Sequence, residues 1–176
     1  MKIKILSELT KKIPFCLFCI MLFANSYSQG LKSLDNAFGI SKFKLKSSFD
    51  VYKKDLKYFD TNKQGIEFYT YTKGDVLTLF GQDVKSINLG YVNNKLYTIS
   101  INLGSLDKKQ NMALLEKLKE LYSTPEIILP NNDLIYVAKW ETGKVYMQAQ
   151  EYSCSHQVIP CETEVFIYSK EIKKTL

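Results

Sequence analysis

The stretch VKSINLGYVNNKLYTISINL, residues 84–103, decides the fold of this 176-residue chain. On its first arm, Ile87, Leu89 and Tyr91 alternate with polar or small residues. The second arm, residues 95–103, repeats the alternation, and the apolar side chains expected to face inward are Tyr97, Ile99, Ile101 and Leu103. Asn93-Asn94 joins the arms, and asparagine tolerates the positive φ of a two-residue turn. The pattern predicts an antiparallel hairpin with one buried face.

The segment directly after this hairpin predicts an α-helix that ends before Pro125, since proline cannot continue a helix. Asp107 is placed to cap its first turn, with Gln110 in the capping-box position. Its apolar stripe consists of Leu114, Leu115, Leu118, Leu121 and Tyr122. Lysine and glutamate residues fall on the other side, as expected for a helix that covers a sheet.

A second helix is predicted upstream over residues 47–56, because Phe49, Tyr52 and Leu56 recur at helical spacing. Further strands are expected at residues 67–72, 76–80, 134–140, 145–152 and 164–169. Together these elements predict an α+β fold with a mainly antiparallel sheet, covered by two helices on one face. Its tandem αβββ-like halves would span about residues 35–104 and 105–170, within a single domain over residues 29–176.

The first 28 residues have the order of a secretory signal peptide. Early lysines precede the apolar run IPFCLFCIMLFA, residues 13–24, and a small polar stretch follows it. The run is shorter than the ~20 residues that a spanning helix needs. We therefore expect cleavage, after Ser28 or alternatively after Ser26, with no membrane span after leader removal. The mature protein would be exported and periplasmic or secreted; a retained anchor is the alternative.

The charge of the chain argues against nucleic-acid binding. The formal net charge is +6, and all 24 basic residues are lysine. Without the four lysines and one glutamate of residues 1–28, 20 basic and 17 acidic residues remain, a net charge of +3. The arginine fork that reads guanine edges is absent from the sequence. A nucleic-acid partner is therefore not expected.

Two cysteines, Cys154 and Cys161, remain after the leader. In an oxidising compartment they predict a disulfide that closes a short loop. His156 lies between them, so a metal site of two thiolates and one imidazole is the alternative. Structural zinc sites have four ligands, and the loop supplies three. We expect no metal site and no cofactor.

Several short motifs carry a family resemblance. Phe38-Gly39-Ile40 and Lys44-Leu45, ahead of the helix predicted from Ser47, resemble the opening of small secreted bacterial domains of the β-lactamase-inhibitor-protein-like type. The helix end LYSTP, residues 121–125, followed by Trp140 in a strand, is also similar. The resemblance covers most of residues 35–170. It implies a binding or scaffolding module more than an enzyme, and it transfers no functional residue.

The tyrosines are the candidate binding residues. An aromatic row on an uncovered sheet face is suited to binding a protein, peptide or sugar. The four candidates are Tyr69 and Tyr71, on one face of their strand, and Tyr146 and Tyr152, on the face opposite Val145 and Met147. They predict an exported, non-enzymatic binding or scaffolding module of the bacterial cell envelope, whose partner is an envelope or secreted protein.

Two other functions stay open. A hydrolase outside the cytoplasm would use carboxylates at strand ends, drawn from Glu67, Glu141, Glu151, Glu162 and Glu164. A small-ligand carrier would need a cavity between the helices and the sheet. No catalytic residue is assigned, because residues 29–176 have no GxSxG, CxxC, HExxH or glycine-rich phosphate motif, and the CxxC of Cys16 and Cys19 lies in the apolar run of the leader.

Overall fold

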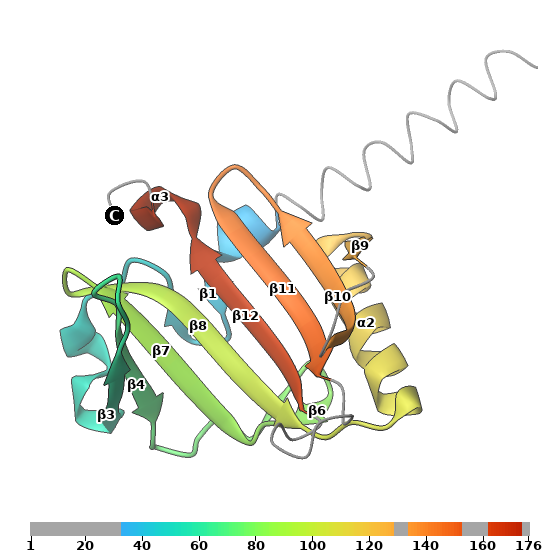
Figure 1. Ribbon diagram of the computed structural model, residues 1–176, viewed down its shortest axis with the longest axis horizontal. Coiled ribbons are helices and arrows are strands. Elements are labelled where there is room, and N and C mark those ends of the chain that lie inside the picture. Colours follow the sequence, from blue (N-terminus) through green and yellow to red (C-terminus); the bar gives the residue numbers. More distant parts are fainter. Residues whose placement is uncertain (1–32, 129–133, 153–161, 174–176) are drawn as a thin grey trace, which may run out of the picture.

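The computed structural model describes residues 33–128, 134–152 and 162–173 (Figure 1). These residues form an α+β fold built on one antiparallel sheet, as the alternation of the sequence predicts. In spatial order the eight strands of the sheet are β3 (Leu56–Thr61), β4 (Glu67–Tyr71), β7 (Ser86–Val92), β8 (Lys95–Gly104), β12 (Thr163–Ser169), β11 (Val145–Tyr152), β10 (Leu134–Glu141) and β9 (Glu126–Ile128). Two short hairpins lie outside this sheet: β1 (Gly39–Ile40) with β2 (Phe43–Lys44), and β5 (Thr78–Leu79) with β6 (Gln82–Asp83).

Each predicted half contributes four strands to the sheet. Strands β3, β4, β7 and β8 precede the long helix α2 (Lys108–Tyr122), and β9 to β12 follow it. The halves join where β8 pairs antiparallel with β12, with Ile99 opposite Ile167. The predicted 84–103 hairpin is present as β7 and β8, and Asn93 and Asn94 both have positive φ.

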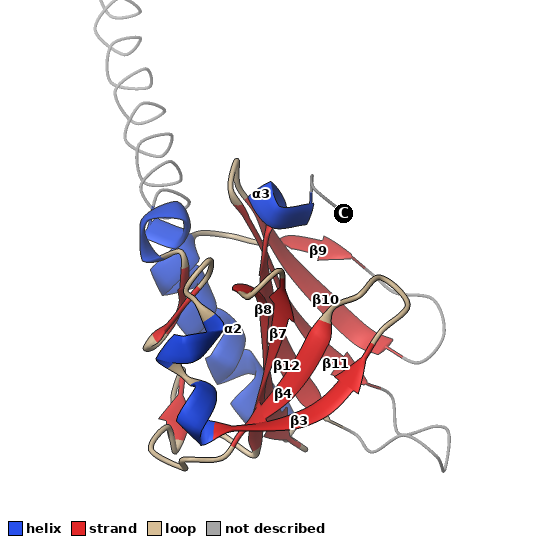
Figure 2. Ribbon diagram, turned by 90° about the vertical axis from the view of Figure 1, so that its left-hand side faces the viewer, coloured by secondary structure: helices blue, strands red, loops and turns tan. Residues whose placement is uncertain are grey.

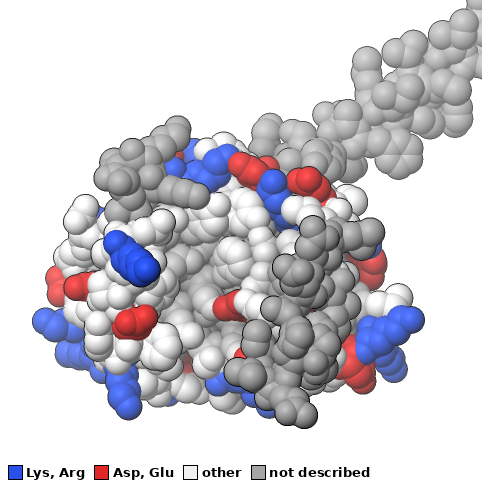
Figure 3. Space-filling model, in the orientation of Figure 1, with Lys and Arg blue, Asp and Glu red and all other residues white. Residues whose placement is uncertain are grey.

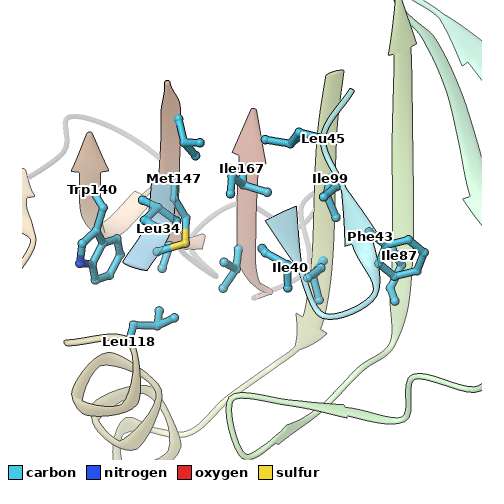
Figure 4. Close-up of a cluster of buried hydrophobic side chains, with 14 of the residues drawn as sticks. Leu34, Ile40, Phe43, Leu45, Ile87, Ile99, Leu118, Trp140, Met147 and Ile167 are labelled. Carbon is cyan, nitrogen blue, oxygen red and sulfur yellow. The ribbon is translucent and has the colours of Figure 1, made fainter. Parts of the chain in front are cut away.

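One face of the sheet is covered by α2, the helical residues 33–37, both short hairpins and two 3-10 turns (Figure 2). The capping box of Asp107 and Gln110 begins α2, and Leu114 and Leu118 are fully buried beneath it. Figure 4 shows Leu118 close to Trp140 and Met147. The Trp140 indole N–H donates to the Ser123 carbonyl at 2.8 Å, which ties β10 to the end of α2.

The opposite face, called the open face below, carries no helix comparable to α2 among the described residues. Figure 2 shows both edges of the sheet, β3–β4 and β9–β10, bending toward this side and away from α2. The open face is therefore concave. Within the described ranges, the short α3 (Lys170–Lys173) at the end of β12 approaches this face, where Ile172 packs with Tyr97 and Tyr168.

The helix predicted over residues 47–56 is instead two 3-10 turns, η1 (Phe49–Val51) and η2 (Lys53–Asp55). Leu56 then begins β3, and the chain pairs with β4. Non-local backbone bonds hold the segment: Phe49 N–H donates to the Asn94 carbonyl, and Leu96 N–H donates to the Ser47 carbonyl. These bonds tie the segment to the β7–β8 turn and outweigh a weak local helix preference.

Tyr97 was expected to face inward, and the structure corrects this. A β-bulge shifts the β7–β8 register between Gly90 and Tyr91, so that Tyr91 pairs with Leu96 and Gly90 pairs with Thr98. Tyr97 is the extra residue, and it packs with Ile66, Val92 and Tyr168 in a small cluster outside the main core. A bulge reverses the face of a side chain, which period-two alternation does not reveal.

Candidate open-face binding site

A row of four side chains runs along β11 on the open face. These residues, named here the Tyr–Gln row, are Tyr146, Gln148, Gln150 and Tyr152. The Tyr146 hydroxyl donates to Gln148 Oε1 at 2.5 Å, and Gln148 Nε2 donates to Gln150 Oε1 at 2.7 Å. Gln150 Nε2 in turn donates to the Tyr152 hydroxyl. Residues two apart on a strand share a face, so the spacing of the sequence produces the row directly.

The Tyr–Gln row ends at the carboxylate of Glu164 on β12. Glu164 Oε2 accepts from Gln150 Nε2 at 3.0 Å and from the Tyr152 hydroxyl at 3.3 Å. Its other oxygen accepts from the Ser100 hydroxyl on β8. Burial, together with the neighbouring Glu164, raises the pKa of Tyr152 to about 12. A carboxylate only accepts hydrogen bonds. Glu164 therefore fixes the direction of the row, in which each side chain donates toward the Glu164 end of β11.

Aromatic rings stand at the other end of the row. The ring of Tyr146 stacks on that of Tyr168, with centroids 4.7 Å apart and planes 18° apart, and it lies 6.2 Å from Phe166. All three rings are half-buried. They form a rigid apolar surface beside the amides, because stacked rings have few rotamers left to lose on binding.

Charged groups lie at the rim of this region. Lys139 pairs with Glu141 at 3.1 Å and with Glu126 at 3.3 Å, and Lys170 pairs with Glu141 at 2.7 Å. These two lysines hold the pKa of the Glu141 carboxyl below its usual range. Figure 3 shows that most described atoms in the middle of this side of the molecule belong to uncharged residues, while most of the charged side chains lie toward its edges.

The structure divides the four predicted tyrosines. Tyr146 and Tyr152 lie on the open face, as expected. Tyr69 and Tyr71 share one face of β4, but it is the covered face, so the prediction that these two tyrosines lie on an uncovered face is wrong. Tyr69 packs against Phe49 with ring centroids 4.9 Å apart, and Tyr71 is 8% exposed and lies edge-on to Phe43.

The register explains the error. Tyr69 pairs with Leu89, whose side chain is fully buried in the core. Directly opposed residues in an antiparallel pair point to the same face, so Tyr69 and Tyr71 point toward the core. The 3-10 turns and the β1–β2 hairpin cover that side of the sheet. The sequence pattern did not predict that these segments cover it.

Sequence analysis missed Phe166, Tyr168, Gln148, Gln150 and Glu164 as members of the site. A signal was present in EVFIYS, residues 164–169, where Val165 and Ile167 alternate with Glu164, Phe166 and Tyr168. Val165 and Ile167 are fully buried, so the intervening residues face the open side. Alternation with two known core residues was enough to place these side chains.

The carboxylates considered for a hydrolase do not gather at one place. Glu162 and Glu164 are on the open side, where Asn102 donates to Glu162. Glu141 is engaged by Lys139 and Lys170 at the rim. Glu151 lines a pocket beneath α2, on the other side of the sheet. Both oxygens of Glu164 are occupied by protein donors, and no observation favours hydrolysis over binding.

Some predictions concern residues outside the described ranges. The disulfide of Cys154 and Cys161, the metal alternative at His156 and the signal peptide of residues 1–28 all lie there. Within the described ranges, no three His, Cys, Asp or Glu side chains are grouped to hold a metal ion. No helix in those ranges has the length and apolar character needed to cross a membrane.

Comparison with known proteins does not add to this geometry. The chain matches no family model, no curated protein and no solved structure.

Proposed function

We propose that this protein is an exported, non-enzymatic binding module of the bacterial cell envelope, and that it binds a partner protein through the open face of its sheet. The observation that carries the proposal is the Tyr–Gln row with its stacked rings, on a concave face opposite α2. Residues 1–28 support the location, because their order is that of an export signal.

The chemistry of the open face suits protein recognition. Protein-binding surfaces are enriched in tyrosine, which offers a large rigid contact area and a polar tip. Amide, serine and asparagine side chains supply adaptable hydrogen bonds around such rings. On the open face, the Phe166 ring has Gln148 and Ser100 as its cross-strand neighbours, and Glu164 has Gln150 and Asn102.

The arrangement of strands also supports the proposal. Two runs of four antiparallel strands join at their last members to form one broad surface. We propose that the motif resemblance to β-lactamase-inhibitor-protein-like domains extends to the binding of a partner protein on the open face of the sheet.

Photo-crosslinking in intact cells tests the proposal. A photoreactive residue is placed at Ser100 or Phe166 on the open face, and at Glu116 on the outer side of α2, in the full chain with its own leader and a C-terminal tag. We expect the same discrete protein adduct from both open-face positions. Equal adducts from Glu116, or no adduct from either open-face position, would contradict the proposal.

Alanine substitution supplies the matched comparison. Tyr146→Ala removes a ring of the open face, whereas Tyr58→Ala removes a 57% exposed ring from β3, at the edge of the covered side. A ring at the centre of an interface contributes about 2 kcal/mol, which corresponds to roughly thirtyfold weaker binding when it is lost. We expect the Ser100 adduct to fall with Tyr146→Ala and to persist with Tyr58→Ala.

A further inference from the structure

A second concave feature lies on the covered side of the sheet, away from the open face. It is a pocket of about 380 Å³ between the first half of α2 and strands β10 and β11. Its lining residues are Lys108, Asn111, Met112 and Leu115 from α2, Tyr136 from β10 and Glu151 from β11. This volume lies in the range of small-molecule sites, which are typically apolar with a few polar groups.

The walls of the pocket are held by a buried network. Asn111 is 5% exposed, and its Oδ1 accepts from the Tyr136 hydroxyl at 3.2 Å and from the Thr163 hydroxyl at 3.1 Å. Its Nδ2 donates to the Leu106 carbonyl at 3.2 Å. These bonds fix the Tyr136 ring and the first turns of α2, so the pocket is preformed.

Glu151 differs from the other polar residues of the pocket. Among the described residues, no side chain donates a hydrogen bond to its carboxylate or pairs with it. Burial raises the pKa of this carboxyl, since water is partly excluded around it. Its charge also acts on the nearby Tyr136 hydroxyl and adds to the effect of burial, which raises the pKa of that tyrosine.

We propose that this pocket binds a small, mainly apolar amine. The apolar body lies against Met112, Leu115 and the ring of Tyr136, and the ammonium group donates to Glu151. The pocket is open to entering molecules on the α2 side, where Met112 is 59% exposed. This site is independent of the open face, because the sheet separates the two.

An amine is favoured over an anion by the positions of the two charged groups. Lys108 is exposed at the start of α2, so its ammonium is already hydrated and gains little from an anionic ligand. The half-buried Glu151 carboxylate has lost part of its hydration without gaining a donor from the described residues, and a ligand cation supplies one. The difference in solvation between Lys108 and Glu151 therefore favours a positively charged ligand.

Three probes of similar shape test the proposal: 4-phenylbutylamine, 4-phenylbutanol and 4-phenylbutyrate. Isothermal titration calorimetry measures each affinity for the full mature chain, and the ¹³C-methyl NMR signal of Met112 reports where each probe binds. We expect the amine to bind about tenfold more tightly than the alcohol, the effect of one charge-assisted hydrogen bond, and to shift the Met112 signal.

Two variants sharpen the result. Glu151→Gln keeps the shape of the side chain and should abolish the tenfold preference, whereas Glu116→Gln removes an exposed carboxylate of α2 and should leave it unchanged. Met112→Trp places a bulkier side chain at the wall of the pocket and should block all three probes. Tighter binding of phenylbutyrate, or no shift of the Met112 methyl with the amine, would overturn the proposal.

Discussion

At the residue scale, Tyr71 shows how its surroundings change the role of a side chain. Its ring packs against Phe43 in the core, and its hydroxyl donates to Asp75 Oδ1 at 2.9 Å. Lys42 donates to both of these groups and lies over the Tyr71 ring at 4.4 Å from its centroid. Tyr71, which was predicted to bind a partner, is thus part of a polar cluster with Lys42 and Asp75 on the covered side of the sheet.

The Asp75 carboxylate predicts a pH dependence of stability. The Lys42 hydrogen bond, with that of Tyr71, lowers the pKa of Asp75 from 3.8 to about 2. Because the folded pKa lies below the unfolded value, the cluster adds stability above about pH 4, and this contribution is lost as the pH falls toward 2. In Asp75→Asn, stability measured by urea unfolding should depend less on pH between 5 and 2 than in the wild type.

The partner residue supplies the control for this prediction. Lys42→Met should flatten the same pH range in part, because Tyr71 still donates to Asp75 and Lys73 still pairs with it. The double variant should be no flatter than Asp75→Asn, because the Lys42–Asp75 interaction is already lost in that single variant. Additive effects of the two substitutions would show that the lysine and the carboxylate act separately.

At the element scale, the contrast between α2 and residues 47–56 shows what local signals achieve. The α2 helix has a capping box, fifteen residues and a stripe that buries Leu114, Leu118 and Tyr122. The earlier segment has helical spacing over a shorter length, and its backbone also bonds to the distant residues Thr72, Asn94 and Leu96. Short helices are marginal in water, so tertiary bonds decide them.

The capping box of α2 is testable on its own. The Asp107 carboxylate accepts from Gln110 N–H at 2.8 Å, and the Gln110 side chain accepts from Asp107 N–H at 2.9 Å. Asp107→Ala should lower the free energy of unfolding by about 1 kcal/mol. Lys109→Ala, in the first turn but outside the box, should change it by less than about 0.5 kcal/mol. Similar losses in both variants would contradict a specific role for the cap.

At the scale of the whole molecule, the eight-stranded sheet joins the two halves. The β8–β12 pair places Ile99 and Ile101 of the first half against Ile167 and Val165 of the second, and all four are fully buried. The core side chains in Figure 4 come from both halves. A shared core of this kind predicts that the halves unfold together.

The only tryptophan, Trp140, makes this prediction measurable, because it reports on the second half. Ile99→Ala lies in the first half and should destabilise the protein by about 2–4 kcal/mol through the cavity it leaves. We expect the Trp140 fluorescence transition in urea to shift with the far-UV circular dichroism transition. A fluorescence transition that stays in place while the dichroism shifts would contradict cooperative unfolding. Val51→Ala, at a 62% exposed position, should move neither.

The amino-acid pattern by itself determined the β7–β8 hairpin, the α2 helix with its cap, and the α+β class. These are set by short-range periodicity: period two over residues 84–103, and period 3.6 over the helix. The same periodicity showed that Tyr146 and Tyr152 lie opposite the core residues Val145 and Met147.

Only the tertiary structure decided which face of each strand stays open. Period two tells which residues share a face, but not which face a helix or hairpin covers, and tyrosine suits both surroundings. Tyr69 and Tyr71 therefore lie under residues 38–52, and the bulge at Gly90–Tyr91 turns Tyr97 to the open side. The pocket beneath α2 likewise exists only because β10 and β11, distant in the sequence from Lys108, pack against that helix.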